Sequence, residues 1–256
     1  MVFIICIIAL FASLLTFFSG FGLGTILTPV FAIFFPIEIA ISLTAIVHLL
    51  NNIFKLLLVG ITKEREIIIR FGIPSIIASF IGAWALKNLS DAQTVFHYQL
   101  AGHNFDTSPV KICISLLIIV FTLLEIIPSF QKIQFDKKYL AVGGTLSGFF
   151  GGLSGNQGAL RSMFLIKSGL SKESYISTGI LIACMVDFAR IPVYSSRYFS
   201  SGIWENKGLL IAATLSAFAG AYAGSKFLKK ITLAFLQVIV SILLILVAVA
   251  IGSGLI

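Results

Sequence analysis

Long apolar runs with few charges are the feature that most restricts how this chain can fold. Several of them, such as 37–60 and 208–227, hold twenty residues or more, about what a helix needs to cross a ~30 Å hydrocarbon core. Of the 256 residues, 58% are hydrophobic and only 11% are charged, whereas a soluble domain carries about 25% charged residues. We therefore expect an all-α, polytopic helical membrane protein.

The runs fall into two halves of matching order, separated by the linker 128–138. The first half, 1–127, holds a glycine-broken run and three full spans, and the second half, 139–256, repeats that order. A shift of 134 residues aligns Gly24 with Gly158 and Thr44 with Thr178. Internal repeats of this kind are common in transporters. The predicted segments are 2–35, 37–60, 67–86 and 110–127 in the first half, and 139–168, 171–194, 208–227 and 232–251 in the second.

The basic residues discriminate between two topologies. If each broken run crosses once, the 15 basic residues outside the apolar runs divide seven to eight. If each is a re-entrant hairpin, they divide eleven to four, as the positive-inside rule expects. This favours two inverted repeats, with both termini and the polar stretch 87–109 outside. The eleven are Lys63, Arg65, Arg70, Lys132, Lys137, Lys138, Lys167, Lys172, Lys226, Lys229 and Lys230, and the four are Lys87, Lys111, Arg197 and Lys207.

The net charge of +8 and the cysteines exclude several other classes of protein. Basic loops of a membrane protein face anionic lipid, and no basic stripe with interleaved aromatics points to nucleic acid. The three cysteines stand singly in apolar runs, which excludes a disulfide framework or a CxxC metal site. His97, His103 and Asp106 fit solvated loop residues better than metal ligands. We expect no metal and no cofactor.

Glycine-rich turns are predicted to interrupt both broken runs, at 19–24 in the first and at 151–158 in the second. Irregular backbone at membrane depth occurs only where protein buries it or where it lines a wet cavity. A short helix that begins after such a turn offers free N–H groups and the positive end of its dipole to an anion. The alternative is that the glycines only allow close helix packing, as expected for Gly220 and Gly224. The candidate substrate-binding residues at the two turns are Gly22, Gly24, Thr25, Thr28, Asn156, Gln157, Gly158, Arg161 and Ser162.

Arg161 is the most informative of these residues. It stands three residues beyond Gly158, in the first turn of the second short helix. A cation there is unfavourable unless an anion shares the position. Two alternatives to anion binding stay open, namely pairing with a carboxylate such as Asp187 and extension to the lipid headgroups.

Polar residues within the full spans are candidates for the pathway or for coupling: Thr44, His48, Asn51, Asn52, Thr178, Asp187 and Arg190. His48 and Asn52 share a helix face, which either lines a pathway or makes interhelical hydrogen bonds. Asp187 and Arg190 are three residues apart and are interpreted as a structural pair, with a coupling proton on Asp187 as the alternative. Lys55 is close enough to the end of its span to snorkel.

One motif suggests an enzyme. Gly152 to Gly155 fits the GxSG pattern of rhomboid-type intramembrane serine proteases, whose base is a histidine on a later helix. No histidine follows His103, so the serine would have no general base downstream. We do not expect an enzyme.

The broken runs resemble those of the TauE/SafE family of sulfite and organosulfonate exporters, also called the toluenesulfonate uptake permease family. The resemblance is most specific from Ser19 to Pro29 and from Ser147 to Arg161. The family's usual triple glycine is replaced here by Gly22-Leu23-Gly24 and by Gly155-Asn156-Gln157-Gly158. The resemblance implies a prokaryotic inner-membrane carrier for small sulfur oxyanions or sulfonates, and an exporter.

We therefore predict a secondary transporter that moves a small oxyanion by alternating access. Its expected partners are the anion and membrane lipid, with a proton as candidate coupling ion and a homo-oligomer left open. A passive anion channel on the same scaffold is the competing hypothesis.

Overall fold

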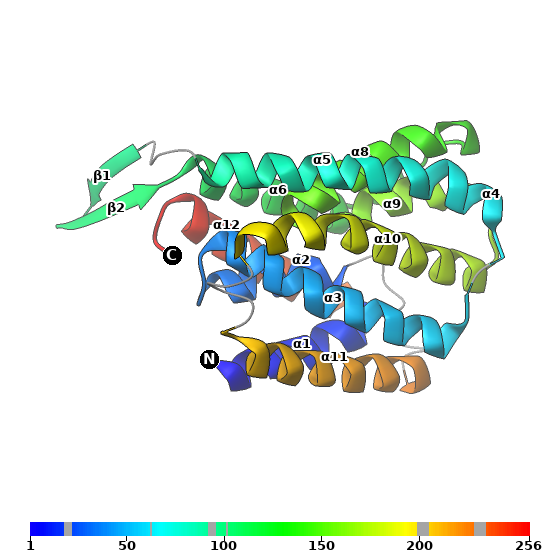
Figure 1. Cartoon of the computed structure of the whole chain (residues 1–256), viewed down its shortest axis with the longest axis horizontal. Helices are drawn as coiled ribbons and strands as arrows, with labels where there is room; N and C mark the ends of the chain where they lie inside the picture. Colours follow the sequence, from blue (N-terminus) through cyan, green and yellow to red (C-terminus); the bar gives the residue numbers. More distant parts are fainter. Residues whose placement is uncertain (18–21, 62, 92–95, 101, 199–204, 228–233) are drawn as a thin grey trace.

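The computed structural model is a bundle of helices whose axes run in nearly the same direction (Figure 1). It describes residues 1–17, 22–61, 63–91, 96–100, 102–198, 205–227 and 234–256. Among these residues, five helical segments are long and apolar enough to cross a membrane. They are α3 (Ile37–Val59), Arg65–Ser90 (α4 Arg65–Ile67, a π-helical turn Ile68–Gly72 and α5 Ile73–Ser90), α6 (Pro109–Ile126), α10 (Lys172–Tyr198) and α11 (Lys207–Phe227). The prediction of a polytopic helical membrane protein is confirmed.

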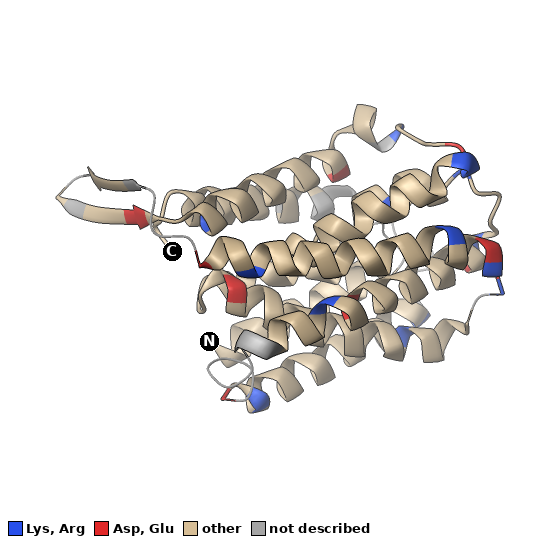
Figure 2. Cartoon of the chain, turned by 45° about the horizontal axis from the view of Figure 1, so that its top comes forward, with Lys and Arg blue, Asp and Glu red and all other residues tan. Residues whose placement is uncertain are grey.

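The surface has the pattern expected of a protein surrounded by lipid. Large apolar side chains point outward, for example Leu57 at 78% and Phe188 at 61% exposure. Two residues after Phe188, Arg190 is completely buried. Figure 2 shows charged residues gathered at the end of the bundle near α4, where Lys137 Nζ lies 2.7 Å from Glu66 Oε2, and few along the helices. Polar groups inside and apolar groups outside are the arrangement that a bilayer favours.

Both glycine-broken segments turn back to the end of the bundle where they began. The first comprises α1 (Val2–Leu15) and α2 (Leu23–Ala32). Residues 32–37 line a cavity together with Lys111 and Ile251, beside the C-terminus, and the N-terminus is at the same end (Figure 1). The second comprises α8 (Leu140–Ser154) and α9 (Gly158–Leu165). Phe135, which precedes α8, donates its backbone N–H to the Met163 carbonyl of α9.

Helix packing connects the two halves. α1 packs against α11, and α8 against α5; α3 packs against α10, and α6 against α12 (Ala234–Gly252). Each of these pairs joins a helix of the first half to one of the second. The pair α1–α11 thus has α8–α5 as its counterpart in the other half, and the pairs α3–α10 and α6–α12 each join corresponding helices. This pattern is consistent with repeats.

Glycines allow the closest of these contacts. A Cβ on Gly144, Gly148 or Gly152 of α8 would overlap the backbone of Phe71, Ser75 or Ser79. On the other side of the molecule, a Cβ on Gly220 of α11 would overlap the carbonyl of Leu10 in α1. Small residues at such positions let two helix backbones approach directly. The packing role expected for Gly220 is thus present, and α8 uses the same device.

Two local predictions were wrong. The stretch Gly151–Ser154 is the last turn of α8 rather than a loop, because its glycines contact neighbouring helices and the helix ends only at Gly155, with φ +82°. The polar stretch 87–109 is not simply a loop: α5 continues to Ser90, and the hairpin β1 (Phe96–Leu100) and β2 (His103–Thr107) follows. The linker 128–138 contains the short helix α7 (Pro128–Gln131) and the start of a 3₁₀ turn at Lys137–Tyr139.

Candidate functional site

The two helix breaks meet inside the bundle. A Cβ on Gly24, in the first turn of α2, would lie 3.1 Å from the carbonyl oxygen of Gly155 and 3.9 Å from Thr44 Cγ2. A Cβ on Gly155 would lie 3.5 Å from Thr28 Oγ1 and 3.2 Å from Arg190 Nη1. The contact of the breaks brings Gly24, Thr28 and Thr44 of the first half to Gly155 of the second. Thr25 is buried beside them, and its backbone N–H donates to the Gly22 carbonyl.

Several buried polar atoms at the breaks have no hydrogen-bond partner among the described residues. They are Thr28 Oγ1, Thr44 Oγ1 and both amide atoms of Asn156 and of Gln157. Each of these side chains is at most 3% exposed. An unsatisfied buried polar group costs about 1–3 kcal/mol, so the region favours water or a polar ligand. The expected backbone site at Gly158 lies one residue beyond Gln157, at the first residue of α9.

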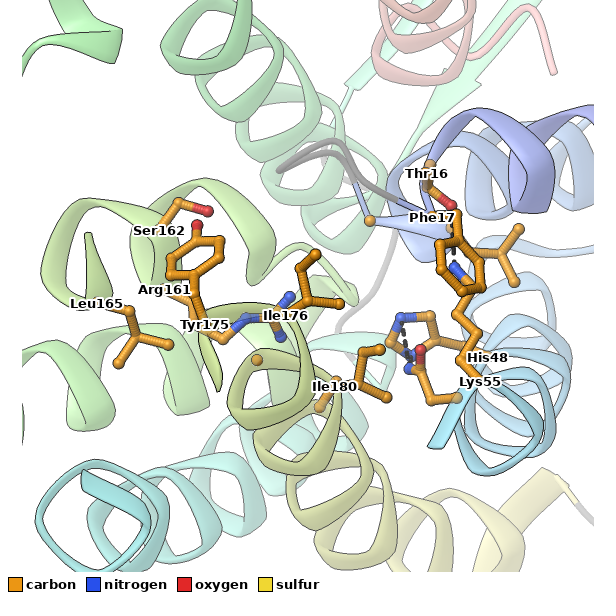
Figure 3. A pocket seen from close by; sticks show the side chains of 15 residues that line it. Thr16, Phe17, His48, Lys55, Arg161, Ser162, Leu165, Tyr175, Ile176 and Ile180 are labelled. Carbon is orange, nitrogen blue, oxygen red and sulfur yellow. Dashed lines mark hydrogen bonds between the residues drawn. The ribbon is translucent and has the colours of Figure 1, made fainter. Parts of the chain in front are cut away.

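A cavity of about 60 Å³ lies between the two halves. One side of it is lined by the residues that follow α1, by the start of α2 and by α3. The other side is lined by α9 and α10 (Figure 3). Of the predicted residues, it brings together Gly22, His48, Asn52, Arg161 and Ser162. The Ser162 hydroxyl donates to the Gly158 carbonyl at 2.9 Å, so its proton is already engaged. The full lining comprises Thr16, Phe17, Gly22, Leu23, His48, Asn52, Lys55, Arg161, Ser162, Leu165, Tyr175, Ile176, Gly179, Ile180 and Ala183.

Two cationic residues line this cavity, and none of its lining residues within the described chain is acidic. Arg161 reaches it from α9, and its buried Nη1 has no hydrogen-bond partner among the described residues. Lys55 reaches it from α3 and is 3% exposed. The Lys55 ammonium donates to Thr16 Oγ1 at 3.4 Å and lies 5.6 Å from the centre of the Phe17 ring. A site with this charge favours a small anion.

The position of Lys55 corrects the sequence-based expectation. Instead of snorkelling to the headgroups, Lys55 is buried beneath the end of α1, because Thr16 and Phe17 close over it. The sequence did contain a signal for this position. His48, Asn52 and Lys55 follow the spacing i, i+4, i+7, which places all three on one helix face.

A buried network of polar side chains leads from the cavity into the second half of the protein. His48 Nδ1 lies 2.7 Å from Asp187 Oδ2. Asp187 Oδ1 accepts a hydrogen bond from Arg190 Nε at 2.9 Å and lies 2.7 Å from Arg190 Nη2 as an ion pair. Both carboxylate oxygens of Asp187 are therefore engaged by His48 and Arg190. The structure pairs Asp187 with Arg190, as their spacing predicts, and adds His48, which no local pattern could have linked to a residue 139 positions away.

The same polar network ends at the last turn of α8. Arg190 Nη1 donates to the Gly151 carbonyl at 2.9 Å, and the Tyr194 hydroxyl donates to the Gly152 carbonyl. These carbonyls stand just before the break at Gly155. The polar network thus connects the cavity to the end of the second broken helix.

The remaining predicted residues lie elsewhere in the core. Asn51 accepts a hydrogen bond from Ser13 Oγ at 3.0 Å, which ties α3 to α1, the interhelical alternative expected for the polar stripe. Thr178 is buried on α10 and is not a lining residue of the cavity. In the hairpin, His97 Nδ1 lies 2.6 Å from Asp106 Oδ1 on the opposite strand, in an exposed pair. Among the described residues, no group of three histidine, cysteine or acidic side chains could hold a metal ion.

Comparison with protein families identifies one model that matches the chain. It is described as Sulfite exporter TauE/SafE, and it matches residues 5–251, nearly the whole length. No curated protein and no solved structure matches the chain.

Proposed function

The chain belongs to the TauE/SafE sulfite exporter family, and from this premise we propose that it carries a small sulfur oxyanion or organosulfonate by alternating access, with the anion bound between Lys55 and Arg161. The family is one of membrane transporters of sulfur compounds, not of enzymes. The proposal places the carrier in a prokaryotic inner membrane, with both termini outside.

The pair of cations on one small cavity carries this proposal. A buried charge without a counter-charge is strongly unfavourable, and the only hydrogen bond that the described residues show for the Lys55 ammonium is to a hydroxyl. An oxyanion offers several acceptor oxygens at the same time to Lys55 and to Arg161 Nη1, which has no hydrogen-bond partner in the described part of the chain. Gly22, the residue before the first turn of α2, adds the N-terminal end of a helix to the same cavity.

The position of the cavity supports alternating access. Lys55 belongs to the first half and Arg161 to the second, so a bound anion would bridge them. We interpret the halves as inverted repeats whose broken segments are re-entrant hairpins in the membrane, an arrangement in which one half can rock against the other around a central site. The helix pairs that connect the halves would be the surfaces along which this motion occurs.

Binding of sulfite and methanesulfonate to purified protein tests the site, first by thermal shift and then by calorimetry, because a bound ligand stabilises the folded state. Lys55→Gln and Arg161→Gln should each weaken binding about 10- to 100-fold, the equivalent of about 1.5–3 kcal/mol for a hydrogen bond to a charged group. Lys63→Gln, which removes a cation from the charged turn before α4, is the matched control and should bind as the wild type does. Wild-type affinity in both cavity variants would refute the site.

Proteoliposome transport separates the carrier from the channel alternative. A carrier gives saturable uptake of labelled substrate and counterflow, whereas a channel gives a flux that grows in proportion to concentration. Arg161→Gln should lose the saturable component while the protein remains folded in the membrane.

Thiol labelling tests the topology. In a background in which alanine replaces Cys6, Cys113 and Cys184, single cysteines at Lys63 and Lys167 should react from the same face of the membrane, and one at Asn104 should react from the opposite face. Labelling at Lys63 and Lys167 from opposite faces would exclude the re-entrant arrangement.

A further inference from the structure

His48 is the one histidine among the described residues that lines the cavity, and Asp187 and Asn52 contact its two ring nitrogens. Its Nδ1 lies 2.7 Å from the Asp187 carboxylate, so Nδ1 carries a hydrogen and donates it. The Asn52 amide nitrogen lies 3.1 Å from Nε2 and 3.3 Å from Nδ1. Because Nδ1 is already a donor, the amide donates to Nε2. With the Asn52 amide in this orientation, these contacts match a neutral imidazole whose Nε2 is an acceptor.

This arrangement can accept one proton with little movement. If the Asn52 amide rotates by half a turn, its oxygen replaces its nitrogen opposite Nε2 and accepts from a new Nε2–H. Nδ1–H keeps its bond to Asp187, and Arg190 keeps that carboxylate in place from the other side. The product is an imidazolium paired with a carboxylate in a buried site, a favourable combination.

The charged residues around His48 determine whether protonation at Nε2 is favourable. Lys55 lies two turns further along the same helix, and Arg161 lies across the cavity (Figure 3). Both repel an imidazolium, while Asp187 attracts it and is shared with Arg190. Tyr175 on the cavity wall and Cys184 on α10 are neutral when protonated. Within their bounds, α2 has no charged residue, and the charged residues of α5 and α11, Lys87, Lys207 and Lys226, stand near the helix ends.

We propose that His48 binds a proton at Nε2 together with the anion that enters the cavity. The anion offsets the repulsion from Lys55 and Arg161, so anion binding favours protonation, and by thermodynamic reciprocity protonation favours anion binding to the same extent. The proton comes from a hydronium ion of the surrounding solution, whose O–H bond breaks and leaves water as the Nε2–H bond forms. The inference rests on the proposed anion site and names a coupling residue for it.

The network also shows how the proton could affect the moving part of the molecule. A charged His48 draws more of the Asp187 carboxylate to itself and weakens its bond to Arg190. Arg190 in turn holds the Gly151 carbonyl at the end of α8. Protonation at the cavity would therefore alter the anchoring of the second broken helix just before its break.

Calorimetric titration with methanesulfonate tests the linkage, because this sulfonate stays fully ionised between about pH 5 and about pH 8, where an unperturbed histidine titrates. Sulfite itself takes up a proton near neutral pH and would confuse the result. For the wild type, affinity should rise by up to about tenfold per pH unit as the pH falls. Titrations in buffers of different ionisation enthalpy should show up to one proton taken up per bound anion.

Two variants make the test specific. Both are made in a Lys55→Arg background, because Lys55 is also buried at the cavity and arginine stays charged between about pH 5 and about pH 8. In this background His48→Gln should bind with an affinity that no longer depends on pH, whereas His97→Gln, in the exposed hairpin pair, should keep the dependence. A pH dependence that survives with His48→Gln in this background would overturn the proposal. The loss of affinity in Lys55→Gln and Arg161→Gln tests the anion site separately, so the two proposals fail in different ways.

A second measurement needs no change at His48. The chain has three histidines, so the double variant His97→Gln/His103→Gln leaves His48 as the only one. Its ¹⁵N spectrum near neutral pH should show the neutral Nδ1–H tautomer without anion and the imidazolium with saturating methanesulfonate. An unchanged tautomer at saturation would refute proton binding at His48.

Discussion

The helix pairs α1–α11 and α8–α5 correspond, but they differ in how many helices contribute glycines to the contact. In each pair a glycine of the partner helix faces a carbonyl of the broken helix, Gly220 of α11 at Leu10 and Gly82 of α5 at Phe149. Helix α8 adds glycines of its own, such as Gly148, which faces the Ser75 carbonyl, whereas α1 contains none. Close approach of two backbones needs one side without a Cβ, and either side can provide it.

The two breaks differ in their backbone as well. Gly22 precedes α2 with φ −85° and ψ 141°, an extended conformation that any residue adopts, while Gly155 ends α8 with φ +82°. The charges differ further: α2 contains no charged residue, and α9 contains Arg161. The first half contributes its cation from a full span instead, as Lys55 of α3. The comparison indicates that the scaffold is shared between the halves while the chemistry of the cavity is not symmetric.

Alanine at the close-packed glycines should have the largest effect. Gly148→Ala and Gly220→Ala each place a methyl group against a backbone carbonyl and should lower the free energy of unfolding by about 1–3 kcal/mol, the usual cost of overpacking. Gly208→Ala in α11 is the control, because nothing lies within 4 Å of its added Cβ. Thermal unfolding in detergent measures all three. Equal stability of Gly148→Ala and Gly208→Ala would contradict the packing role of α8.

The two break glycines should respond unequally. Gly155→Ala puts a Cβ in the left-handed region, which costs about 1–2 kcal/mol, and 3.2 Å from Arg190 Nη1. Gly22→Ala needs no change of backbone and should alter the free energy of unfolding by no more than about 0.5 kcal/mol. If both variants lost the same stability, the difference in backbone between the breaks would not be the reason that Gly155 is needed.

The smallest effect is expected at Thr28, where the first hairpin touches the second break. Thr28→Val removes a hydroxyl that has no partner among the described residues, so stability should change little. If that hydroxyl contacts the anion during transport, affinity should fall about 2- to 10-fold, the equivalent of about 0.5–1.5 kcal/mol for one hydrogen bond. Thr122→Val is matched to it, since Thr122 is also buried and unpartnered among the described residues but lies on α6, outside the cavity lining. A similar loss of affinity in both variants would exclude a specific role for Thr28.

Sequence reasoning predicted the helices well because their signal is local. The span predicted at 37–60 is observed at Ile37–Val59, and that at 110–127 is observed at Pro109–Ile126. The turn predicted at Gly151–Ser154 was wrong because glycine normally weakens a helix. The packing of α8 against α5, which local sequence does not reveal, explains why the helix continues through these glycines. The two-stranded hairpin was missed because its strands are polar and short.

The site was only partly predictable for a different reason. Arg161 stands out because charge is scarce in an apolar chain, and a local rule suffices to select it. The burial of Lys55 depends on the end of α1 closing over it, and the bond between His48 and Asp187 joins residues 139 positions apart. Neither can be derived from spacing without knowing which helices are neighbours.

Because α1, α3, α5 and α6 each pack against a helix of the second half, the order of synthesis constrains how the protein assembles. α1 is the first of these helices to leave the ribosome, but the helix against which it packs, α11, ends at residue 227. Until then the first hairpin has no glycine-bearing surface to receive it, and insertion of the chain must precede its assembly. A ribosome stalled before α11 would therefore leave α1 accessible to protease or to a translocon cross-linker, and release of the last two helices would protect it.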